Sequence, residues 1–340
     1  LKKPKFAFHG ACAGCGETAY IKLLTQLTDN LVIANATGCS SIYGGDVSNL
    51  PYKTPWASSL FEDNAEFGFG MLLGYEANRE KVRNYMLKNK NELFEKWLNN
   101  SNNYKITKEV EEKTDYKKHP KLKKLKNYIT SKNIWAVGGD GWAYDIGFGG
   151  IDHVLSSNSN INILVLNTES YSNTGGQQSK ASPKGAVLEF ASLGKKTYKK
   201  DLAKIAMSYP NTYVAQINLG SNMNQAIKAI TEANNHNGPS IIIAYCPCIA
   251  HGIKKGMCES INIEKLATKC GYFPIFRYNE KFILDSKTPD FNLYEEFLNN
   301  QNRFTMLKAV NKEKASQLLN ENKDNAIKRF EYYKSLENQD

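Results

Sequence analysis

The sequence predicts an α/β protein built on a doubly wound, mostly parallel sheet. Three observations predict this fold class. Runs of β-branched and aliphatic residues alternate along the chain with segments of helical periodicity. Two of these runs, residues 161–166 and 241–244, are almost continuously apolar, as expected for strands that helices cover on both faces. The chain has 340 residues, 41% of them hydrophobic, which is enough to bury the sizeable core that such a sheet requires.

The predicted elements alternate in chain order, and this alternation is typical of a doubly wound domain. The predicted strands cover residues 31–35, 134–138, 161–167, 212–219, 240–245 and 273–278. The predicted helices cover residues 17–28, 146–157, 200–209, 223–235 and 263–269.

A helical insertion interrupts this alternation. Helical periodicity runs from residue 62 to residue 100, and glycine is absent from residues 75–137. We therefore interpret residues 79–133 as a basic, helical insertion in the α/β domain, with a loop near residues 101–103.

The end of the chain is predicted as a further charged helix, from Val310 onward. Residues 286–289 are expected to set it apart from the core. The predicted division is an α/β domain over residues 1–300 and a helical tail over residues 301–340.

The positive charge of the chain is concentrated in the insertion. The formal net charge is +10, and residues 79–133 hold sixteen Lys or Arg against seven Asp or Glu. The aromatic residues there are scattered and form no aromatic-interleaved RNA motif. The pattern therefore favours a solvated helical face over a nucleic-acid patch, and we expect no nucleic-acid partner.

Composition also limits the location of the protein. No apolar run approaches the roughly 20 residues that span a bilayer, and no secretion signal is present. Seven cysteines without such a signal indicate a reducing compartment, so we expect a soluble cytoplasmic protein, or an organellar one in an anaerobic eukaryote. Because the first residue is leucine, we expect the chain to be part of a longer or processed protein.

Two strand ends carry the residues that predict a cofactor. The turn Gly139-Asp140-Gly141 follows the strand over 134–138, and the next strand ends in Asn167-Thr168-Glu169-Ser170. In open α/β sheets, ligands bind beyond the carboxyl ends of strands. Glycine lets the backbone approach a phosphate, and carboxylate oxygen is a ligand that Mg²⁺ prefers. An ordinary strand exit uses the same residues, but the pairing of two such ends favours a magnesium-anchored phosphate.

A polar loop, Tyr171-Ser-Asn-Thr-Gly-Gly-Gln-Gln-Ser179, follows the second of these strands. It can be an exposed surface loop. Its position beside the predicted metal favours a loop that covers the ligand.

Four cysteines lie where they could bind a metal centre: two among small residues near the start of the chain, and two after the ends of predicted strands. Cys12 and Cys15 lie in the stretch GACAGCGE, while Cys39 and Cys248 each follow a predicted strand. Three loops at one sheet edge can supply four thiolates, the number that a [4Fe-4S] cluster needs. Structural zinc and a redox disulfide are the alternatives. The glycines and alanines favour the cluster, which is bulkier than one ion and accepts backbone N–H bonds at its sulfurs.

The three remaining cysteines are interpreted differently. Cys246 can replace Cys248 as a ligand, while Cys258 and Cys270 are predicted to be ordinary free cysteines.

Together these segments resemble the C-terminal thiamine diphosphate and cluster domain of the pyruvate:ferredoxin (flavodoxin) oxidoreductases, and the resemblance covers nearly the whole chain. It rests on GACAGCGET, NATGCSSIYGG, SLFEDNAEFGFGM, GGDGWAYDIGFGGIDHVL, NTESYSNTGGQQSKASPKGA, GPSIIIAYCPCIAHG and LDSKTPD, in this order.

The resemblance implies a thiamine diphosphate-binding fold and a set of site residues. It implies that the [4Fe-4S] ligands are Cys12, Cys15, Cys39 and Cys248. It implies that Mg²⁺ is held by Asp140, the Thr168 side chain and the Ser170 carbonyl, with Asn173 facing the reacting thiazolium. The cofactor-binding residues that it implies are Gly139, Asp140, Gly141, Trp142, Asn167, Thr168, Ser170, Asn173, Thr174, Gly175 and Gln177.

The activity that the resemblance implies is oxidative decarboxylation of pyruvate, with acetyl transfer to coenzyme A. Electrons pass singly to ferredoxin, flavodoxin or a fused reductase domain; a pyruvate:NADP⁺ or another 2-oxoacid oxidoreductase is the alternative. A homodimer is expected. In this family the carboxylate on the aminopyrimidine and the substrate-binding arginine come from N-terminal domains that this chain does not match, so we expect the isolated chain to be catalytically incomplete.

Two segments depart from the family. The chain is shorter between Gly45 and Trp56, where it lacks a Gly-Arg-Gly-Pro-like segment, and again between Tyr278 and Leu284. Either the loops are truly short or residues are missing from the sequence there, and in both cases the resemblance does not extend to contacts from these loops.

Overall fold

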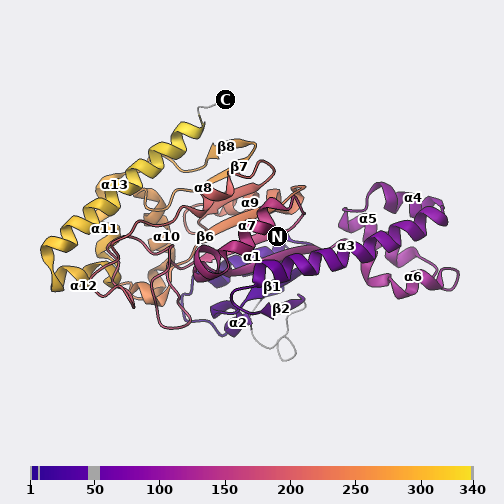
Figure 1. Ribbon diagram of the computed structural model, residues 1–340, viewed down its shortest axis with the longest axis horizontal. Helices are drawn as coiled ribbons and strands as arrows, with labels where there is room; N and C mark the ends of the chain where they lie inside the picture. Colours follow the sequence, from indigo (N-terminus) through magenta and orange to yellow (C-terminus); the bar gives the residue numbers. More distant parts are fainter. Residues whose placement is uncertain (1, 7, 45–53, 338–340) are drawn as a thin grey trace.

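A mixed sheet forms the centre of the molecule. The computed structural model describes residues 2–6, 8–44 and 54–337, and the shortened segment that follows Gly44 lies largely outside them. The sheet has the strand order β2-β1-β3-β4-β6-β5-β7-β8 (Figure 1). Its strands are β1 (Leu31–Ala36), β2 (Trp56–Ser59), β3 (Asn133–Gly139), β4 (Asn162–Asn167), β5 (Tyr213–Ile217), β6 (Ser240–Tyr245), β7 (Phe276–Asn279) and β8 (Lys281–Leu284). The predicted doubly wound, mostly parallel α/β fold is confirmed.

Helices cover both faces of this sheet. The helices of the described residues, including three that project away from the sheet, are α1 (Glu17–Leu27), α2 (Cys39–Gly44), α3 (Asn64–Lys88), α4 (Glu92–Asn99), α5 (Tyr104–Lys113), α6 (Pro120–Lys124), α7 (Phe148–Ser156), α8 (Leu202–Ala206), α9 (Met223–Asn235), α10 (Ser260–Lys269), α11 (Tyr294–Asn299), α12 (Asn302–Val310) and α13 (Lys312–Glu337). Among the described residues, no helix has both the length and the apolar character that crossing a bilayer requires.

Alternate residues of each strand enter two different cores, which explains why the strand sequences are apolar throughout. In β3, Trp135 and Val137 pack with α1 and α9 on one face. Ile134 and Ala136 pack with α3 and α7 on the other face. The central strands are therefore fully buried.

One end of the sheet differs from the prediction. Residues 273–278 were expected to form another parallel strand, but β7 begins at Phe276 and runs antiparallel to β5. It then turns through Glu280, which has a left-handed backbone, into β8, so the shortened segment between Tyr278 and Leu284 closes a tight hairpin. A run of apolar residues does not encode the direction of its strand.

Two helices also differ from their predicted bounds. The helix expected over residues 200–209 is limited to α8, and the helix expected from residue 146 is α7, which begins two residues later. A π-helical segment, Gly141–Ile146, precedes α7 and directly follows Asp140. Such segments are rare and frequent at functional sites.

The basic insertion forms an arm with a hydrophobic core of its own. The second half of α3 continues into α4, α5 and α6, which project from one end of the molecule (Figure 1). The buried residues of this small core are Val82, Met86, Phe94, Trp97, Val110, Leu122 and Ile129.

The C-terminal helix is not set apart from the core, contrary to the prediction. Ala326 and Tyr333 of α13 are buried in the same cluster as β7 and β8, and the Tyr333 hydroxyl donates to Asp201 at 2.8 Å. Most charged residues of α13 are exposed, although Arg329 donates to the Tyr272 carbonyl, and the apolar residues of the helix are buried. Charge alone therefore misjudged its place.

Candidate functional site

The carboxyl ends of β1, β3, β4 and β6 meet at one edge of the sheet, because these four neighbours are parallel. The loop before α1 joins them there. The Gly16 N–H donates to the Pro247 carbonyl at 3.0 Å, and the Tyr20 hydroxyl donates to the Tyr245 carbonyl at 2.9 Å. The thiol-bearing N-terminal loop is thus fixed against the loop that holds Cys248.

Buried oxygen atoms form the centre of this edge. Asp140 is fully buried, and its Oδ1 accepts hydrogen bonds from the Thr168 amide at 3.1 Å and hydroxyl at 3.0 Å. Its Oδ2 accepts from the Ser179 hydroxyl at 2.5 Å. The Thr168 hydroxyl also lies 3.1 Å from the Ser170 carbonyl oxygen. The Thr168 hydroxyl therefore lies within hydrogen-bonding distance of both other predicted magnesium ligands.

Electrostatics at Asp140 favour a cation. Burial raises the pKa of Asp140 to about 6, although the hydroxyls of Ser179 and Thr168 oppose the shift. A buried carboxylate without a positive partner is costly. The neighbouring Asn167 amide is also buried, with neither its Oδ1 nor its Nδ2 hydrogen-bonded among the described residues. Hard oxygen ligands and an unpaired buried amide together fit a magnesium-bound phosphate ligand.

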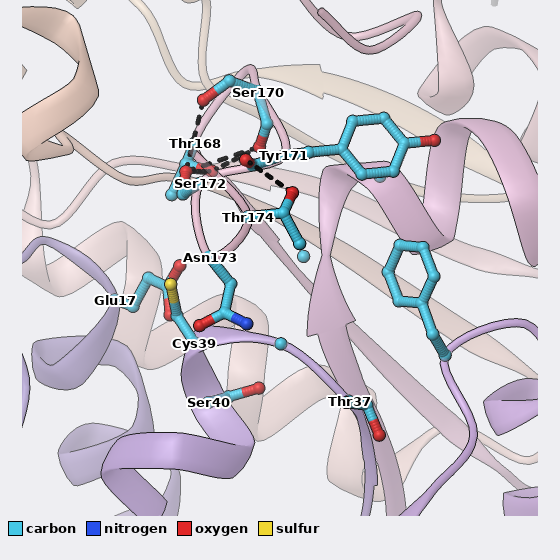
Figure 2. A pocket seen from close by; sticks show the side chains of 14 residues that line it. Glu17, Thr37, Cys39, Ser40, Thr168, Ser170, Tyr171, Ser172, Asn173 and Thr174 are labelled. Atoms are coloured by element: carbon cyan, nitrogen blue, oxygen red, sulfur yellow. Dashed lines mark hydrogen bonds between the residues drawn. The ribbon is translucent and has the colours of Figure 1, made fainter. Parts of the chain in front are cut away.

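A cavity of about 220 Å³ opens beside these oxygens (Figure 2). The predicted residues that line it are Gly139, Gly141, Thr168, Ser170, Asn173 and Thr174. Tyr171 and Phe61 form one wall, with their ring centroids 5.8 Å apart. This cavity is called the oxygen cavity below.

The two glycines of the turn have different roles. A Cβ on Gly141 would lie 2.6 Å from the Tyr171 ring, whereas the nearest atom to a Cβ on Gly139 would be 3.9 Å away. Gly141 is therefore required for packing of the loop. Gly139 has no such requirement within the protein, so any requirement for it must come from a ligand.

Five predicted cofactor-binding residues, with the buried Asp140 among them, do not line the oxygen cavity. Trp142 is fully buried against Gly138 and Gly147, and Asn167 is also fully buried. Gln177 folds back on Thr174, donating from Nε2 to its carbonyl at 2.8 Å. Gly175 has a left-handed backbone that turns the loop.

A second cavity, of about 160 Å³, is lined by Cys12, Cys15, Cys39 and Cys248. These are the four cysteines that the sequence grouped, and all are free thiols. Within the described ranges, no three or more His, Cys, Asp or Glu side chains are grouped so that they could hold a metal ion. This cavity is called the thiol cavity below.

The remaining cysteines lie elsewhere. Cys246 is fully buried in the core beneath α1 and does not line the thiol cavity. Cys270 is buried in the other core, and Cys258 is exposed.

Burial favours the neutral form of three of these thiols, Cys15, Cys39 and Cys248. Burial and the nearby Glu17 raise the pKa of Cys15 to about 12, and burial also raises the pKa of Cys39 and Cys248. Backbone amides oppose this at Cys15, and at Cys248 the Ala250 N–H donates to Sγ at 3.4 Å. Amide donors of this kind stabilise thiolates once a positive centre is present.

Four residues form a wall between the two cavities, because each lines both of them: Glu17, Cys39, Ser172 and Asn173. Figure 2 shows that the Asn173 side chain extends from its loop toward Glu17 and Cys39. Cys39 and Asn173 were predicted as site residues; Glu17 and Ser172 were not. Glu17 ends the quoted GACAGCGE stretch, so its position beside the thiols was the available signal.

Glu17 is a buried carboxyl group in this wall. Burial raises the pKa of Glu17 to about 7, and the Tyr43 hydroxyl, which donates to it at 2.8 Å, opposes the shift. The group is therefore partly protonated near neutral pH.

A buried charge network supports the loop from behind. Glu169 has a left-handed backbone, and its carboxylate accepts from Lys199 at 2.7 Å, Arg303 at 2.8 Å and the Tyr272 hydroxyl at 2.6 Å. Although burial alone would raise it, Lys199 and Arg303 lower the pKa of Glu169 to about 2. The strained residue is thus fixed between Thr168 and Ser170, and sequence reasoning did not identify its partners.

Comparison with known proteins adds independent evidence. Residues 122–244 match the family described as thiamine pyrophosphate enzyme, C-terminal TPP binding domain. Over 99% of its length the chain is 45% identical to pyruvate:ferredoxin oxidoreductase of Moorella thermoacetica, of which it covers 32%. It is 43% identical to pyruvate-flavodoxin oxidoreductase of Klebsiella pneumoniae over 99% of this chain and 31% of that protein. The chain therefore spans about a third of the length of these curated relatives.

Two further likenesses are weaker or cover less of the relative. A mitochondrial pyruvate dehydrogenase (NADP⁺) of Euglena gracilis is 42% identical over 99% of this chain and 20% of its own length. A solved 2-oxoglutarate:ferredoxin oxidoreductase of Magnetococcus marinus, with 2-oxoglutarate, coenzyme A and succinyl-CoA bound, is 15% identical. Its TM-score is 0.45, over 73% of this chain and 69% of that chain, a likeness too distant to bear on function.

Proposed function

We propose that this chain is the part of a pyruvate:ferredoxin or pyruvate-flavodoxin oxidoreductase that binds thiamine diphosphate, Mg²⁺ and a [4Fe-4S] cluster. The premise is that residues 122–244 match the C-terminal TPP binding domain of the thiamine pyrophosphate enzymes, and that the chain is similar along its length to part of these oxidoreductases. The reaction is oxidative decarboxylation of pyruvate, with acetyl transfer to coenzyme A and electron transfer to ferredoxin or flavodoxin.

The observation that carries this proposal is the shared wall. An oxygen cavity suited to a magnesium diphosphate and a cavity lined by four thiols adjoin each other at Glu17, Cys39, Ser172 and Asn173. A one-electron acceptor must lie close to the carbon that is oxidised, and two adjoining cavities meet this requirement. The arrangement is not needed for either site alone.

On the oxygen side, Asp140, the Thr168 hydroxyl and the Ser170 carbonyl would hold Mg²⁺. Bound thiamine diphosphate supplies the carbanion and the electron sink of the reaction. The chain would position the bound cofactor. The Tyr171 and Phe61 rings form an apolar wall of the cavity, and Asn173 and Glu17 supply polar groups in the wall that separates the two cavities.

On the thiol side, Cys12, Cys15, Cys39 and Cys248 would hold the cluster. A single zinc ion needs four ligand atoms at about 2.0 to 2.3 Å, whereas the four cysteines here line a cavity of about 160 Å³. The corners of a cubic cluster separate its thiolates further. The thiol cavity therefore favours the cluster over structural zinc.

The missing part of the active site makes partners necessary. We propose that the aminopyrimidine carboxylate and the substrate-binding arginine come from N-terminal domains of the same enzyme, which assembles as a homodimer in the cytoplasm or in an organelle of an anaerobic cell. The isolated chain would then bind its cofactors but not turn over pyruvate.

Anaerobic reconstitution tests the proposal. We expect the chain to take up four iron and four sulfide ions, to become brown, and to give the electron paramagnetic resonance signal of a reduced cluster. Addition of the missing N-terminal portion should restore pyruvate-dependent reduction of a viologen dye. A colourless protein with one zinc ion, or full activity without the N-terminal portion, contradicts the proposal.

The electron acceptor has a second candidate. The similarity to the NADP⁺-dependent enzyme of Euglena gracilis favours a fused reductase that passes electrons to NADP⁺. Pyruvate-dependent reduction of NADP⁺ without added ferredoxin or flavodoxin, by the complete enzyme from its source, would identify it.

A further inference from the structure

A third cavity, of about 280 Å³, lies apart from the oxygen cavity and the thiol cavity. Among the described residues that line it, one is acidic, Asp201, and five are cationic: Lys199, Lys200, Lys204, Lys328 and Arg329. No described residue that lines it also lines either of the other two cavities. It is called the cationic cavity below. Cationic side chains rarely gather in a hollow of a protein unless a partner offsets their charge, so we searched for that partner.

Helix α13 forms one wall of the cationic cavity. Asn325, Lys328, Arg329 and Tyr332 line the cavity at spacings of three and four residues. Such spacings place side chains on one face of a helix. The next residue, Tyr333, is buried in the core that contains β7 and β8. The packing of α13 on this core therefore holds its two cationic side chains at the cavity.

The Arg329 guanidinium has donors left for a ligand. The residue is half-buried, and its guanidinium donates to the Tyr272 carbonyl at 2.6 Å, which orients it. A guanidinium carries five N–H donors in a planar fork that matches the oxygens of a phosphate. One hydrogen bond within the described part of the chain leaves most of these donors unused.

The start of α8 forms another wall. Lys199 and Lys200 precede this helix, and Lys204 lies in it. The Lys199 ammonium donates to the buried Glu169 carboxylate at 2.7 Å, so its charge is already offset. The Lys200 ammonium donates to the Tyr144 carbonyl at 3.1 Å, a neutral acceptor that does not offset a charge.

The protein itself does not supply the missing negative charge. Four cations of the cavity form no ion pair with a carboxylate among the described residues: Lys200, Lys204, Lys328 and Arg329. The one acidic residue of the lining, Asp201, is the N-cap of α8, and its carboxylate accepts from the Lys204 N–H at 3.1 Å. The Tyr333 hydroxyl also donates to this carboxylate at 2.8 Å. Four cations thus face one carboxylate that already has partners.

Half-buried Lys200 shows the effect of this imbalance. Burial and the nearby Lys180 lower the pKa of Lys200 to about 8, although Asp145 and Asp152 oppose the shift. Neither carboxylate lines the cavity: Asp145 pairs with Lys180 at 3.2 Å, and Asp152 accepts from the Tyr209 hydroxyl at 2.6 Å. The charged form of Lys200 is therefore incompletely stabilised by the protein, and a bound anion would stabilise it.

We propose that the cationic cavity is a binding site for a small phosphate ester, whose phosphate is held by Arg329, Lys200 and Lys328. A phosphate ester carries close to two negative charges near neutral pH, so it offsets several cations at once. Phe273 and Tyr332 line the same cavity and supply apolar surface for the organic part of the ester. The site goes beyond the proposed function and does not depend on it, because it uses no residue of the oxygen cavity or the thiol cavity.

Equilibrium dialysis of the 340-residue chain against phenyl phosphate tests the inference. The first series is measured at low ionic strength with a chelator, so that no divalent ion brings the probe into the oxygen cavity. We expect one phenyl phosphate to bind per chain, and we expect no binding of phenol, which has the ring without the charge. In a second series, saturating Mg²⁺ and thiamine diphosphate replace the chelator. The affinity for phenyl phosphate should not change, since the two cavities share no described residue.

Three variants locate the probe. Lys200→Gln and Lys328→Gln should each weaken binding by about threefold to tenfold, because each removes one cation from the phosphate. Lys323→Gln removes the same charge from the same helix, but Lys323 does not line the cavity, so it should change the affinity by less than about twofold. Lys328 is exposed, so its replacement should leave the fold intact, and thermal unfolding of each variant checks this.

Three outcomes would overturn the inference. The first is the absence of saturable binding of phenyl phosphate. The second is equal weakening in Lys323→Gln and Lys328→Gln, because net charge alone would then account for the binding. The third is displacement of the probe by thiamine diphosphate and Mg²⁺, because the probe would then lie in the oxygen cavity.

Discussion

The oxygen cavity and the thiol cavity share a wall, yet their polar groups differ in how far the protein stabilises their charged forms. In the oxygen cavity, the Asp140 carboxylate already accepts three hydrogen bonds from Thr168 and Ser179. In the thiol cavity, burial raises the pKa of Cys15, Cys39 and Cys248, and few donors oppose it. The carboxylate beside the oxygen cavity is therefore preorganised by hydrogen bonds, whereas the thiols of the thiol cavity would need a bound metal to become thiolates.

The largest effect is expected when a cysteine of the thiol cavity is replaced. Cys248→Ala should lose nearly all of the iron and sulfide taken up on reconstitution, because a cubic cluster needs four thiolates. The matched control is Cys246→Ala, two residues away and buried outside the cavity, which should retain the cluster. Iron content and visible absorption measure both. Loss of the cluster in Cys246→Ala alone would exchange the roles of the two cysteines.

The next effect breaks the oxygen side. Asp140→Asn should lower the magnesium-dependent affinity for thiamine diphosphate by about 100-fold, because it removes the only charged ligand of the proposed metal. Titration calorimetry with and without Mg²⁺ measures it. Reconstitution of the cluster should be unchanged in this variant, since Asp140 does not line the thiol cavity. Unchanged affinity would exclude Asp140 as a ligand.

In the metal-free chain, Asp140→Asn also tests how the buried carboxyl group affects stability as a function of pH. The pKa of Asp140 is raised from its ordinary value of 3.8 to about 6, so the folded state holds a proton that the unfolded state releases. The free energy of unfolding of the metal-free chain should therefore decrease as pH rises from about 4 to about 6. Asp140→Asn lacks this contribution and should be more stable above pH 6, by roughly 2 to 3 kcal/mol. Urea unfolding at pH 4, 5, 6 and 7 measures the difference, and parallel pH profiles would contradict it.

The smallest expected effect concerns the two glycines of the turn. Gly141→Ala should weaken thiamine diphosphate binding by about tenfold, because its methyl group would displace the Tyr171 ring. Gly139→Ala meets no atom of the protein closer than 3.9 Å and should leave the fold intact. If Gly139→Ala weakens binding as much as Gly141→Ala while the stability is unchanged, the phosphate itself requires the space at Gly139.

The strands and the thiol set could be predicted from the sequence because their signals are local. The continuously apolar runs around Ile163 and Ile242 mark strands that are buried on both faces, and cysteines at strand ends gather wherever parallel strands end together. The antiparallel direction of β7 could not be predicted in this way, because pairing is decided by the partner strand. The place of α13 was also missed, since an amphipathic helix with a charged outer face resembles a free one.

The parts of the site that were missed act through long-range contacts. Ser172 belongs to a loop whose polar residues look alike in sequence, and only its place in the wall between the two cavities and its hydrogen bond to Thr168 at 2.7 Å distinguish it. His251 was quoted within a motif without a role, and its partner Thr168 is 83 residues away. Lys199, Arg303 and Tyr272 surround Glu169 only after folding. No pattern of spacing announces such contacts.

The network around Glu169 has a consequence for how the protein matures. Glu169 lies between two proposed magnesium ligands, but Tyr272 and Arg303 follow it by 103 and 134 residues in the chain. During synthesis, Lys199 follows the loop by only 30 residues, but Tyr272 and Arg303, the other two partners of the carboxylate, leave the ribosome much later. The loop that holds the proposed magnesium ligands can therefore complete these contacts only after Arg303 has been made, and premature termination before Arg303 should give a chain that builds its central strands but not the complete proposed cofactor site.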